Sequence, residues 1–157
     1  MRNTCASVHI ALTAATPDAL DGTVRAYATL GFQHAKSASP EGGKDVILRR
    51  KEGEAFLSVY DGDNAALDTG ELKDLALAAS KILKTAAVST SLYDSDTFEV
   101  VVFNAGKQVD VVMTHPEEYS GPLKVLRDKS RATTWSKVFG RPLTTAGIRQ
   151  AISTDSV

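Results

Sequence analysis

The chain of 157 residues has a single cysteine and no hydrophobic run that approaches the length of a membrane-spanning helix. Because Cys5 has no cysteine partner, an intrachain disulfide is excluded, and we expect a reducing, cytoplasmic setting. The N-terminal sequence MRNTCASVHIAL holds one arginine and a short apolar run that breaks at Thr13, which is not the pattern of a signal peptide. We therefore expect a cytoplasmic protein without a membrane partner.

Short motifs that identify common cofactor sites are also missing. The sequence contains no Walker loop, no Gly-x-Gly-x-x-Gly, no Cys-x-x-Cys and no Gly-x-Ser-x-Gly nucleophile elbow. One local echo is present, since Ser58-Val59-Tyr60-Asp61-Gly62-Asp63 recurs as Ser91-Leu92-Tyr93-Asp94-Ser95-Asp96. Each copy is either a strand end with a packed tyrosine and turn-capping aspartates, or an Asp-x-Asp pair that ligates a hard cation such as Mg²⁺ or Ca²⁺.

Hydrophobic periodicity and turn residues predict one α+β domain over residues 1–157. The expected order is β-α-β-β-β-α-β-β-β-α-α, with a mostly antiparallel sheet of hairpins and helices on one side of it. Residues 121–157 should form a helical C-terminal extension packed on the sheet body. The patterns place single strands at 7–13, 32–36 and 86–93 and two-stranded segments at 45–61 and 97–114. They place helices at 16–31, 71–84, 120–139 and 144–152.

Two of these segments are predicted β-hairpins. In 45–61 the turn is expected at Glu52-Gly53, which sets Arg49 beside Phe56 and Ile47 beside Ser58. In 97–114 the turn is Asn104-Ala105-Gly106-Lys107, and Phe103 should pair with Gln108. In this second register one side of the hairpin is wholly apolar, and we expect it to be buried. Its pairs are Val102 with Val109, Val100 with Val111 and Phe98 with Met113. Its other side is mixed and pairs Val101 with Asp110 and Glu99 with Val112.

The charge of the chain is unevenly distributed. Residues 1–120 are acidic overall, whereas residues 121–149 hold seven basic residues and only one acidic residue. These basic residues are Lys124, Arg127, Lys129, Arg131, Lys137, Arg141 and Arg149. The segment either docks on the acidic body or presents a patch to an acidic partner. The spacing of Trp135 from its apolar neighbours is that of a core side chain, and a core tryptophan does not stack on bases. We therefore do not expect a nucleic-acid partner.

His9 is the residue whose position most suggests chemistry. It lies in the middle of the first predicted strand, opposite the apolar face of Val8, Ile10 and Leu12. If the mixed faces of the strands share one side, His9 could face Glu99 or Asp110. A histidine with one or two carboxylates can bind a divalent metal or act as a general acid and base, and a half-buried structural histidine is the alternative.

The first part of the chain also resembles the opening of the vicinal oxygen chelate (glyoxalase/bleomycin-resistance) superfamily. The residues that carry this resemblance are Val8-His9-Ile10-Ala11-Leu12, a helix that ends in Tyr27, and Leu30-Gly31-Phe32. Residues 7–61 follow the β-α-β-β-β module of that family, and the resemblance implies a metal-ligand role for His9. The chain departs from the family in having Ala55-Phe56-Leu57-Ser58-Val59-Tyr60 where a glutamate ligand is usual. Residues 71–114 also lack the leading strand of a second module.

Two functions from different classes are compatible with these features. The first is a vicinal oxygen chelate-like protein that binds a small molecule, with or without a divalent metal, in a cleft on the concave sheet face. Its predicted site has His9, Glu99 and Asp110 as catalytic residues, Tyr60 and Tyr93 as ligand-binding residues, and His9 as metal ligand. The alternative is a non-catalytic protein-interaction module that uses the basic segment 121–149. Free edge strands and the paired modules of the family are compatible with a homodimer.

Overall fold

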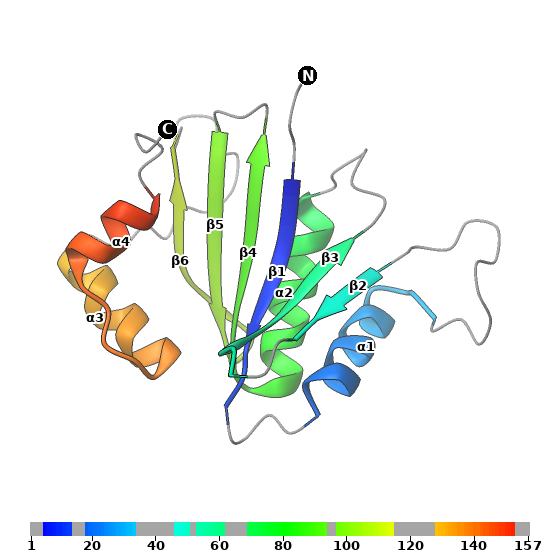
Figure 1. The fold of residues 1–157 in the computed structure, drawn as a ribbon. Coiled ribbons are helices and arrows are strands. Elements are labelled where there is room, and N and C mark those ends of the chain that lie inside the picture. The colour runs from blue at the N-terminus through cyan, green and yellow to red at the C-terminus, as the bar shows by residue number, and fades with distance from the viewer. Residues whose placement is uncertain are drawn as a thin grey trace.

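The computed structural model describes residues 5–13, 18–33, 46–50, 53–61, 69–93, 97–114 and 128–152. Six strands pair into one sheet, antiparallel throughout, in the order β2-β3-β1-β4-β5-β6 (Figure 1). The strands are β1 (Cys5–Ala11), β2 (Val46–Arg49), β3 (Phe56–Asp61), β4 (Ala86–Tyr93), β5 (Thr97–Asn104) and β6 (Lys107–Met113). The helices are α1 (Ala19–Thr29), α2 (Thr69–Leu83), α3 (Asp128–Phe139) and α4 (Thr145–Ile152).

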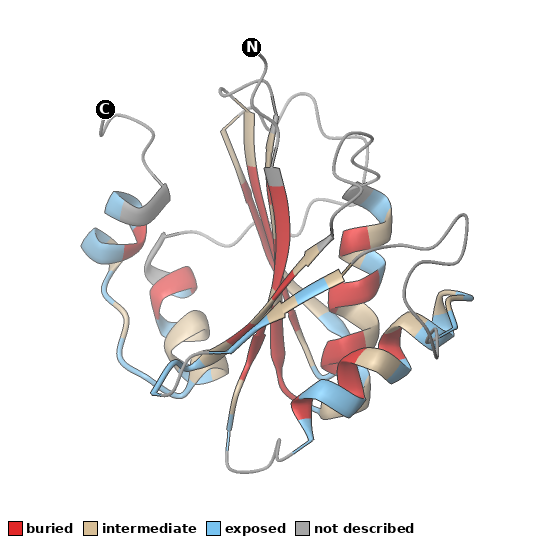
Figure 2. Ribbon diagram, turned by 45° about the vertical axis from the view of Figure 1, so that its right-hand side comes forward, coloured by how far each residue is buried: buried red, intermediate tan, exposed pale blue. Residues whose placement is uncertain are grey.

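The predicted α+β class with an antiparallel sheet is confirmed, but the helices cover both faces of the sheet. Helices α1 and α2 lie on one face, which we call the α2 face, and α3 lies with α4 on the other, the α3 face (Figures 1 and 2). The strand expected at 32–36 is not present at Phe32 and Gln33, and the rest of that segment lies outside the described residues.

The main core lies between the sheet and α2. Alternate residues of β1, including Val8 and Ile10, are fully buried against the apolar stripe of α2. That stripe contains the residues that the helical period predicts, namely Leu72, Leu75, Ala76, Ala79, Ile82 and Leu83. Because strand residues alternate between faces, His9 must lie on the α3 face.

The β5–β6 hairpin turns where predicted, at Ala105 and Gly106, which both have positive φ values of 48° and 81°. Phe103 pairs with Gln108 as predicted, but the register then shifts, and Val102 lies opposite Asp110 instead of Val109. The predicted pairing beyond Phe103 is therefore wrong, because a β-bulge leaves Val109 as an extra residue in β6.

The bulge separates the two carboxylates that the predicted register had placed on one side. Glu99 lies opposite Met113 on the α2 face, whereas Asp110 lies opposite Val102 on the α3 face. Both are buried, with 4% and 0% of their surface exposed. The sequence predicts that both carboxylates lie on one mixed face, whereas the structure buries them on opposite faces of the sheet.

The β2–β3 hairpin also differs from its predicted register. Arg49 lies opposite Ser58 and Ile47 opposite Tyr60, a shift of two residues from the expected pairs. The shift arises because β2 ends at Arg49 and β3 begins at Phe56, so the connection is longer than a two-residue turn. A shift of two residues keeps every side chain on its predicted face.

Candidate functional site

The α3 face of the sheet has an apolar half and a polar half. In the apolar half, Val100, Val102 and Val112 pack against side chains of α3, among them Trp135, Val138 and Phe139. In the polar half, β3, β1 and β4 bring five side chains together, which we call the His9 cluster. Its members are Ser7, His9, Ser58, Tyr60 and Thr90.

Strand pairing positions these side chains. His9 lies opposite Ser58 in the β1–β3 ladder, and Ser7 lies opposite Thr90 in the β1–β4 ladder. Side chains of directly opposite residues in an antiparallel pair are neighbours on one face, with Cβ atoms about 4.5–5.5 Å apart. The cluster is thus a product of three strands that are distant in sequence.

Both ring nitrogens of His9 are hydrogen-bonded to hydroxyl groups. The Nδ1 atom lies 2.9 Å from Ser58 Oγ, and the Nε2 atom lies 2.9 Å from Ser7 Oγ. Ser7 Oγ in turn lies 2.8 Å from Thr90 Oγ1. These contacts form a continuous chain of exchangeable protons from Ser58 to Thr90.

One arrangement of the protons satisfies all of these contacts at once, and the reverse order satisfies all except the contact of Thr90 with the Ser7 carbonyl. The Thr90 hydroxyl donates to the backbone carbonyl of Ser7 at 3.4 Å, which leaves its oxygen to accept from the Ser7 hydroxyl. Ser7 Oγ can then accept from His9 Nε2–H, and Nδ1 is left to accept from the Ser58 hydroxyl. Burial lowers the pKa of His9 below its usual value, so the imidazole is neutral near pH 7.

Two further residues border the His9 cluster on the side of β2. Arg49 lies across the ladder from Ser58, and Ile47 lies across from Tyr60. Arg49 is exposed, and Ile47 has 63% of its surface exposed, which is high for a large apolar side chain. The Tyr60 ring meets the imidazole of His9 edge-on, with 6.5 Å between ring centroids. A cation, an apolar side chain and an aromatic ring therefore adjoin the hydroxyl–imidazole chain.

The structure does not bring the predicted catalytic carboxylates to His9. Glu99 is on the opposite face, where Lys73 Nζ lies 2.8 Å from its Oε1 atom. Asp110 shares the face of His9 and even its cross-strand row, but Val88 of β4 and Val102 of β5 stand between them. The proposed pairing of His9 with either carboxylate is therefore corrected.

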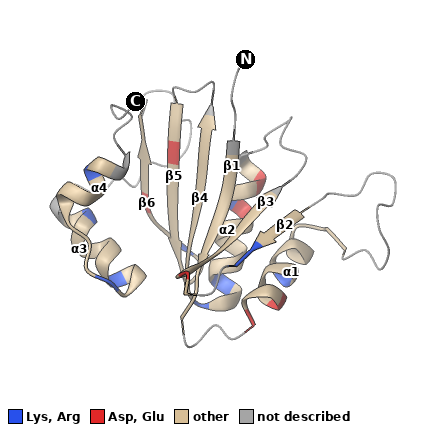
Figure 3. Cartoon of the chain, viewed as in Figure 1, with Lys and Arg blue, Asp and Glu red and all other residues tan. Residues whose placement is uncertain are grey.

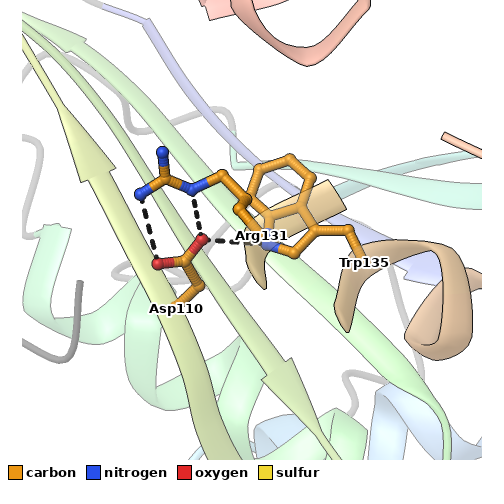
Figure 4. Close-up of polar contacts among 3 residues, drawn as sticks. All are labelled: Asp110, Arg131 and Trp135. Carbon is orange, nitrogen blue, oxygen red and sulfur yellow. Dashed lines mark hydrogen bonds and ion pairs between the residues drawn. The ribbon is translucent and has the colours of Figure 1, made fainter. Parts of the chain in front are cut away.

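Asp110 instead anchors helix α3 to the sheet. Arg131 Nε donates to Asp110 Oδ2 at 2.6 Å, Arg131 Nη2 lies 3.5 Å from Oδ1, and Trp135 Nε1 donates to Oδ2 at 3.0 Å (Figure 4). The three side chains converge from β6 and from one face of α3. Because Asp110 is fully buried, these partners are what makes its charge tolerable there.

The anchoring of α3 also corrects one part of the interaction-module hypothesis. Arg131 is buried on Asp110, so its charge is used inside the protein and does not contribute to a surface patch. Lys137 and Arg149 are exposed and place positive charge on α3 and α4 (Figure 3). Lys124 and Arg127 lie outside the described residues, as does the side chain of Lys129.

Of the predicted ligand-binding residues, Tyr60 lies beside His9, whereas the side chain of Tyr93 is outside the described residues. Sequence reasoning missed the roles of Ser7, Ser58, Thr90 and Arg49. A signal existed for Ser7 only, because residues two apart in a strand share a face and Ser7 therefore accompanies His9. The other three are assigned by strand pairing, which the sequence does not reveal.

A metal site at His9 stays a prediction. Within the described parts of the chain, no three His, Cys, Asp or Glu side chains gather where they could hold a metal ion. The side chains hydrogen-bonded to the His9 ring are hydroxyls, which are weaker ligands for divalent transition metals than carboxylates or imidazoles. The Asp-x-Asp pairs extend into segments outside the described residues.

No protein-family model, no curated protein and no solved structure matches this chain. The vicinal oxygen chelate resemblance therefore remains a resemblance of short sequence segments. Over the described residues, none of the helices combines the length and the apolar character needed to cross a bilayer.

Proposed function

We propose that this protein binds a small organic anion, such as a carboxylate, on the polar half of the α3 face. The observation that carries the proposal is the cross-strand row of Arg49, Ser58 and His9, which places a cation, a hydroxyl and a neutral imidazole side by side. These groups are of the kinds that fix the orientation of a small ligand.

Each part of the row has a separate role in recognition. Arg49 presents a planar guanidinium that can bind a carboxylate through two parallel hydrogen bonds. Ser58 and His9 can each donate or accept, because reversing the proton order along the hydroxyl chain exchanges their roles. A ligand with a carboxylate and a second polar group could therefore use all three residues.

The neighbouring row supplies apolar contact. Ile47 and Tyr60 lie one step along the same face, and covering the part of Ile47 that is still exposed would be favourable by about 1–2 kcal/mol. An anionic head at Arg49 and an apolar body over Ile47 and Tyr60 define the ligand class. The resemblance to the vicinal oxygen chelate superfamily supports a site on this face, since it singles out His9.

Thermal unfolding with a panel of small carboxylates, for example benzoate, phenylacetate and succinate, tests this proposal. A ligand at 100 times its dissociation constant should raise the free energy of unfolding by about 2.7 kcal/mol, which is a shift of several degrees in Tm. The Arg49→Gln variant should bind about tenfold more weakly because a charge-assisted hydrogen bond is lost. At the same ligand concentration its stabilisation should then fall to about 1.4 kcal/mol.

The matched control is Arg25→Gln, which removes one exposed arginine from α1 on the opposite face. Its ligand-induced shift should equal that of the wild type. Equal shifts in the wild type and Arg49→Gln would contradict the proposed site. Repeating the panel with EDTA and with Mg²⁺, Mn²⁺, Zn²⁺, Ni²⁺ or Ca²⁺ tests whether binding depends on a metal held by His9. Metal-dependent binding requires a metal-induced shift in Tm that is lost in His9→Ala.

A further inference from the structure

We infer that Ser58 and His9 act as nucleophile and general base in acyl transfer from small anionic esters. The inference rests on the proposed binding site, because the same row of side chains must first hold the ester. It is carried by the 2.9 Å hydrogen bond from Ser58 Oγ to His9 Nδ1 together with the 2.9 Å contact of His9 Nε2 with Ser7 Oγ. A hydroxyl, a base within hydrogen-bonding distance and a third group that orients the base are the parts that serine nucleophiles require.

Of the four residues in this chain, Ser7, which lies behind the imidazole, is the most buried. Ser58 and His9 are half-buried, so part of the surface of each residue is open to solvent. Ser7 has only 8% of its surface exposed, and Thr90 holds its hydroxyl from the far side. Ser7 and Thr90 are therefore positioning residues that keep the imidazole in one orientation.

The imidazole is also in the protonation state that a base must have. The proton order that ends at the Ser7 carbonyl puts hydrogen on Nε2 and leaves the lone pair of Nδ1 directed at the Ser58 hydroxyl. Burial, with no carboxylate against the ring in the described part of the chain, favours the neutral imidazole, which can accept the serine proton near pH 7.

The reaction proceeds in two balanced steps. Ser58 Oγ attacks the ester carbonyl carbon while its proton passes to His9 Nδ1, and the C–O bond to the alcohol then breaks as the leaving oxygen takes that proton. Water attacks the resulting acyl-Ser58, gives its proton to Nδ1, and the carboxylic acid leaves as Ser58 Oγ regains the proton. No oxidant, reductant or metal is needed for either step.

The neighbours of Ser58 select the ester and stabilise its transition state. Among the described residues, Arg49 lies opposite Ser58 across the β2–β3 ladder and Tyr60 lies two residues along β3, so we assign stabilisation of the oxyanion to their N–H and O–H groups. The charge of Arg49 also favours esters that carry a second, anionic group. The substrate class is therefore a small ester with a carboxylate.

The rate should be low, because the group behind the imidazole is a neutral hydroxyl. Losing the aspartate of a Ser-His-Asp triad lowers kcat by about 10⁴-fold, since the imidazolium that forms is then less well held. An activated ester is therefore the suitable probe, and a pre-steady-state burst should reveal the acyl enzyme.

The test uses the full chain with 5-acetoxy-2-nitrobenzoate and with 4-nitrophenyl acetate, its analogue without the carboxylate. We expect a burst of nitrophenolate, an acetyl group on the peptide that contains Ser58, and preference for the anionic ester. Ser58→Ala should abolish the burst and lower turnover by about 100-fold or more, whereas Ser130→Ala, an exposed serine of α3, should match the wild type. Ser7→Ala should lower kcat and leave KM unchanged, because a positioning residue does not touch the ester.

The two proposals can fail separately in this experiment. If 5-hydroxy-2-nitrobenzoate, the reaction product, raises Tm in an Arg49-dependent manner but no Ser58-dependent burst occurs, acyl transfer is overturned and binding stands. If no burst occurs and neither this product nor any carboxylate of the panel raises Tm in an Arg49-dependent manner, both are overturned. An acetyl group on another residue, or an unchanged burst in Ser58→Ala, also overturns the inference.

Discussion

At the scale of single residues, the surroundings of His9 decide what it can do. A carboxylate neighbour would favour a charged imidazole, whereas Ser7 and Ser58 leave the ring neutral and able to exchange protons in either direction. Strand alternation predicts the face on which His9 lies. Its partners cannot be predicted in the same way, because Ser58 is brought to His9 by a ladder between segments 49 residues apart.

The neutral state of His9 makes stability depend on pH. Burial lowers the pKa of His9 in the native state below its usual value of 6.5, so the unfolded chain binds more protons between the two pKa values. The contribution of His9 to the free energy of unfolding should be complete above pH 6.5 and should decrease as pH falls below that value. Urea unfolding of the wild type and His9→Gln, from about pH 8 down to about pH 5, measures this contribution.

The difference in unfolding free energy between these two proteins should shrink as the solution is acidified. Only the wild type has a buried imidazole whose protonation lowers its free energy of unfolding. Curves that stay parallel over the whole range would show that His9 does not resist protonation in the native state.

At the scale of elements, the β5–β6 hairpin shows what an amphipathic pattern can and cannot predict. Its turn follows from Asn104-Ala105-Gly106-Lys107, and the structure has it there. Its register beyond Phe103 could not be predicted, because the run Val109-Asp110-Val111-Val112 offers apolar side chains to either face. A single extra residue in β6 is enough to send Asp110 to α3 and to leave Glu99 with Lys73.

The turn of this hairpin docks on the end of α2 and leaves no room for a larger residue. Gly106 has φ 81°, its N–H donates to Ser80 Oγ at 3.0 Å, and a Cβ added to it would lie 2.9 Å from Lys81 Cβ. Gly106→Ala should therefore destabilise the protein through the left-handed backbone, by about 1–2 kcal/mol, and additionally through overpacking, by about 1–3 kcal/mol. The midpoint of urea unfolding gives the total loss.

Gly53 is the matched control for that substitution. Its φ of 80° is nearly the same, but a Cβ there would meet nothing within 4 Å. Gly53→Ala should therefore show the backbone cost alone. Equal losses for the two variants would mean that the contact between the turn and α2 does not constrain residue 106.

At the scale of the whole molecule, the sheet is held between two helical layers that differ in how they attach. The α1–α2 layer rests on a large apolar core, which the helical period of α2 predicts directly. The α3 layer combines a smaller apolar cluster with the buried ion pair of Arg131 and Asp110. The basic segment predicts docking on an acidic body. It does not predict that Asp110 is the buried acceptor, because Asp110 faces α3 only as a result of the bulge in β6.

Breaking the ion pair should loosen the α3 layer. Arg131→Met removes the cation from the buried carboxylate of Asp110, to which Trp135 still donates, and should cost about 3–5 kcal/mol. Asp110→Asn should also destabilise, and the double variant should lose less than the sum of the two. Fluorescence of Trp135, the single tryptophan, can follow the unfolding of each variant.

Lys137→Met serves as the control on the same helix, because Lys137 is exposed. Its effect should stay within about 0.5 kcal/mol. Strictly additive losses for Arg131→Met and Asp110→Asn would show that the pair does not couple α3 to the sheet.

Binding of a small anion over the row of Arg49, Ser58 and His9 should be visible directly at the atoms of these residues. The most direct measurement is a ¹H–¹⁵N NMR titration of the labelled protein with the carboxylate that gives the largest thermal shift, including the ring nitrogens of His9. We expect saturable shifts that centre on β2, β3 and the His9 imidazole and that weaken in Arg49→Gln. Shifts that centre on α1, α2 or the exposed lysines and arginines of α3 and α4, or that persist unchanged in Arg49→Gln, would show that the anion binds elsewhere.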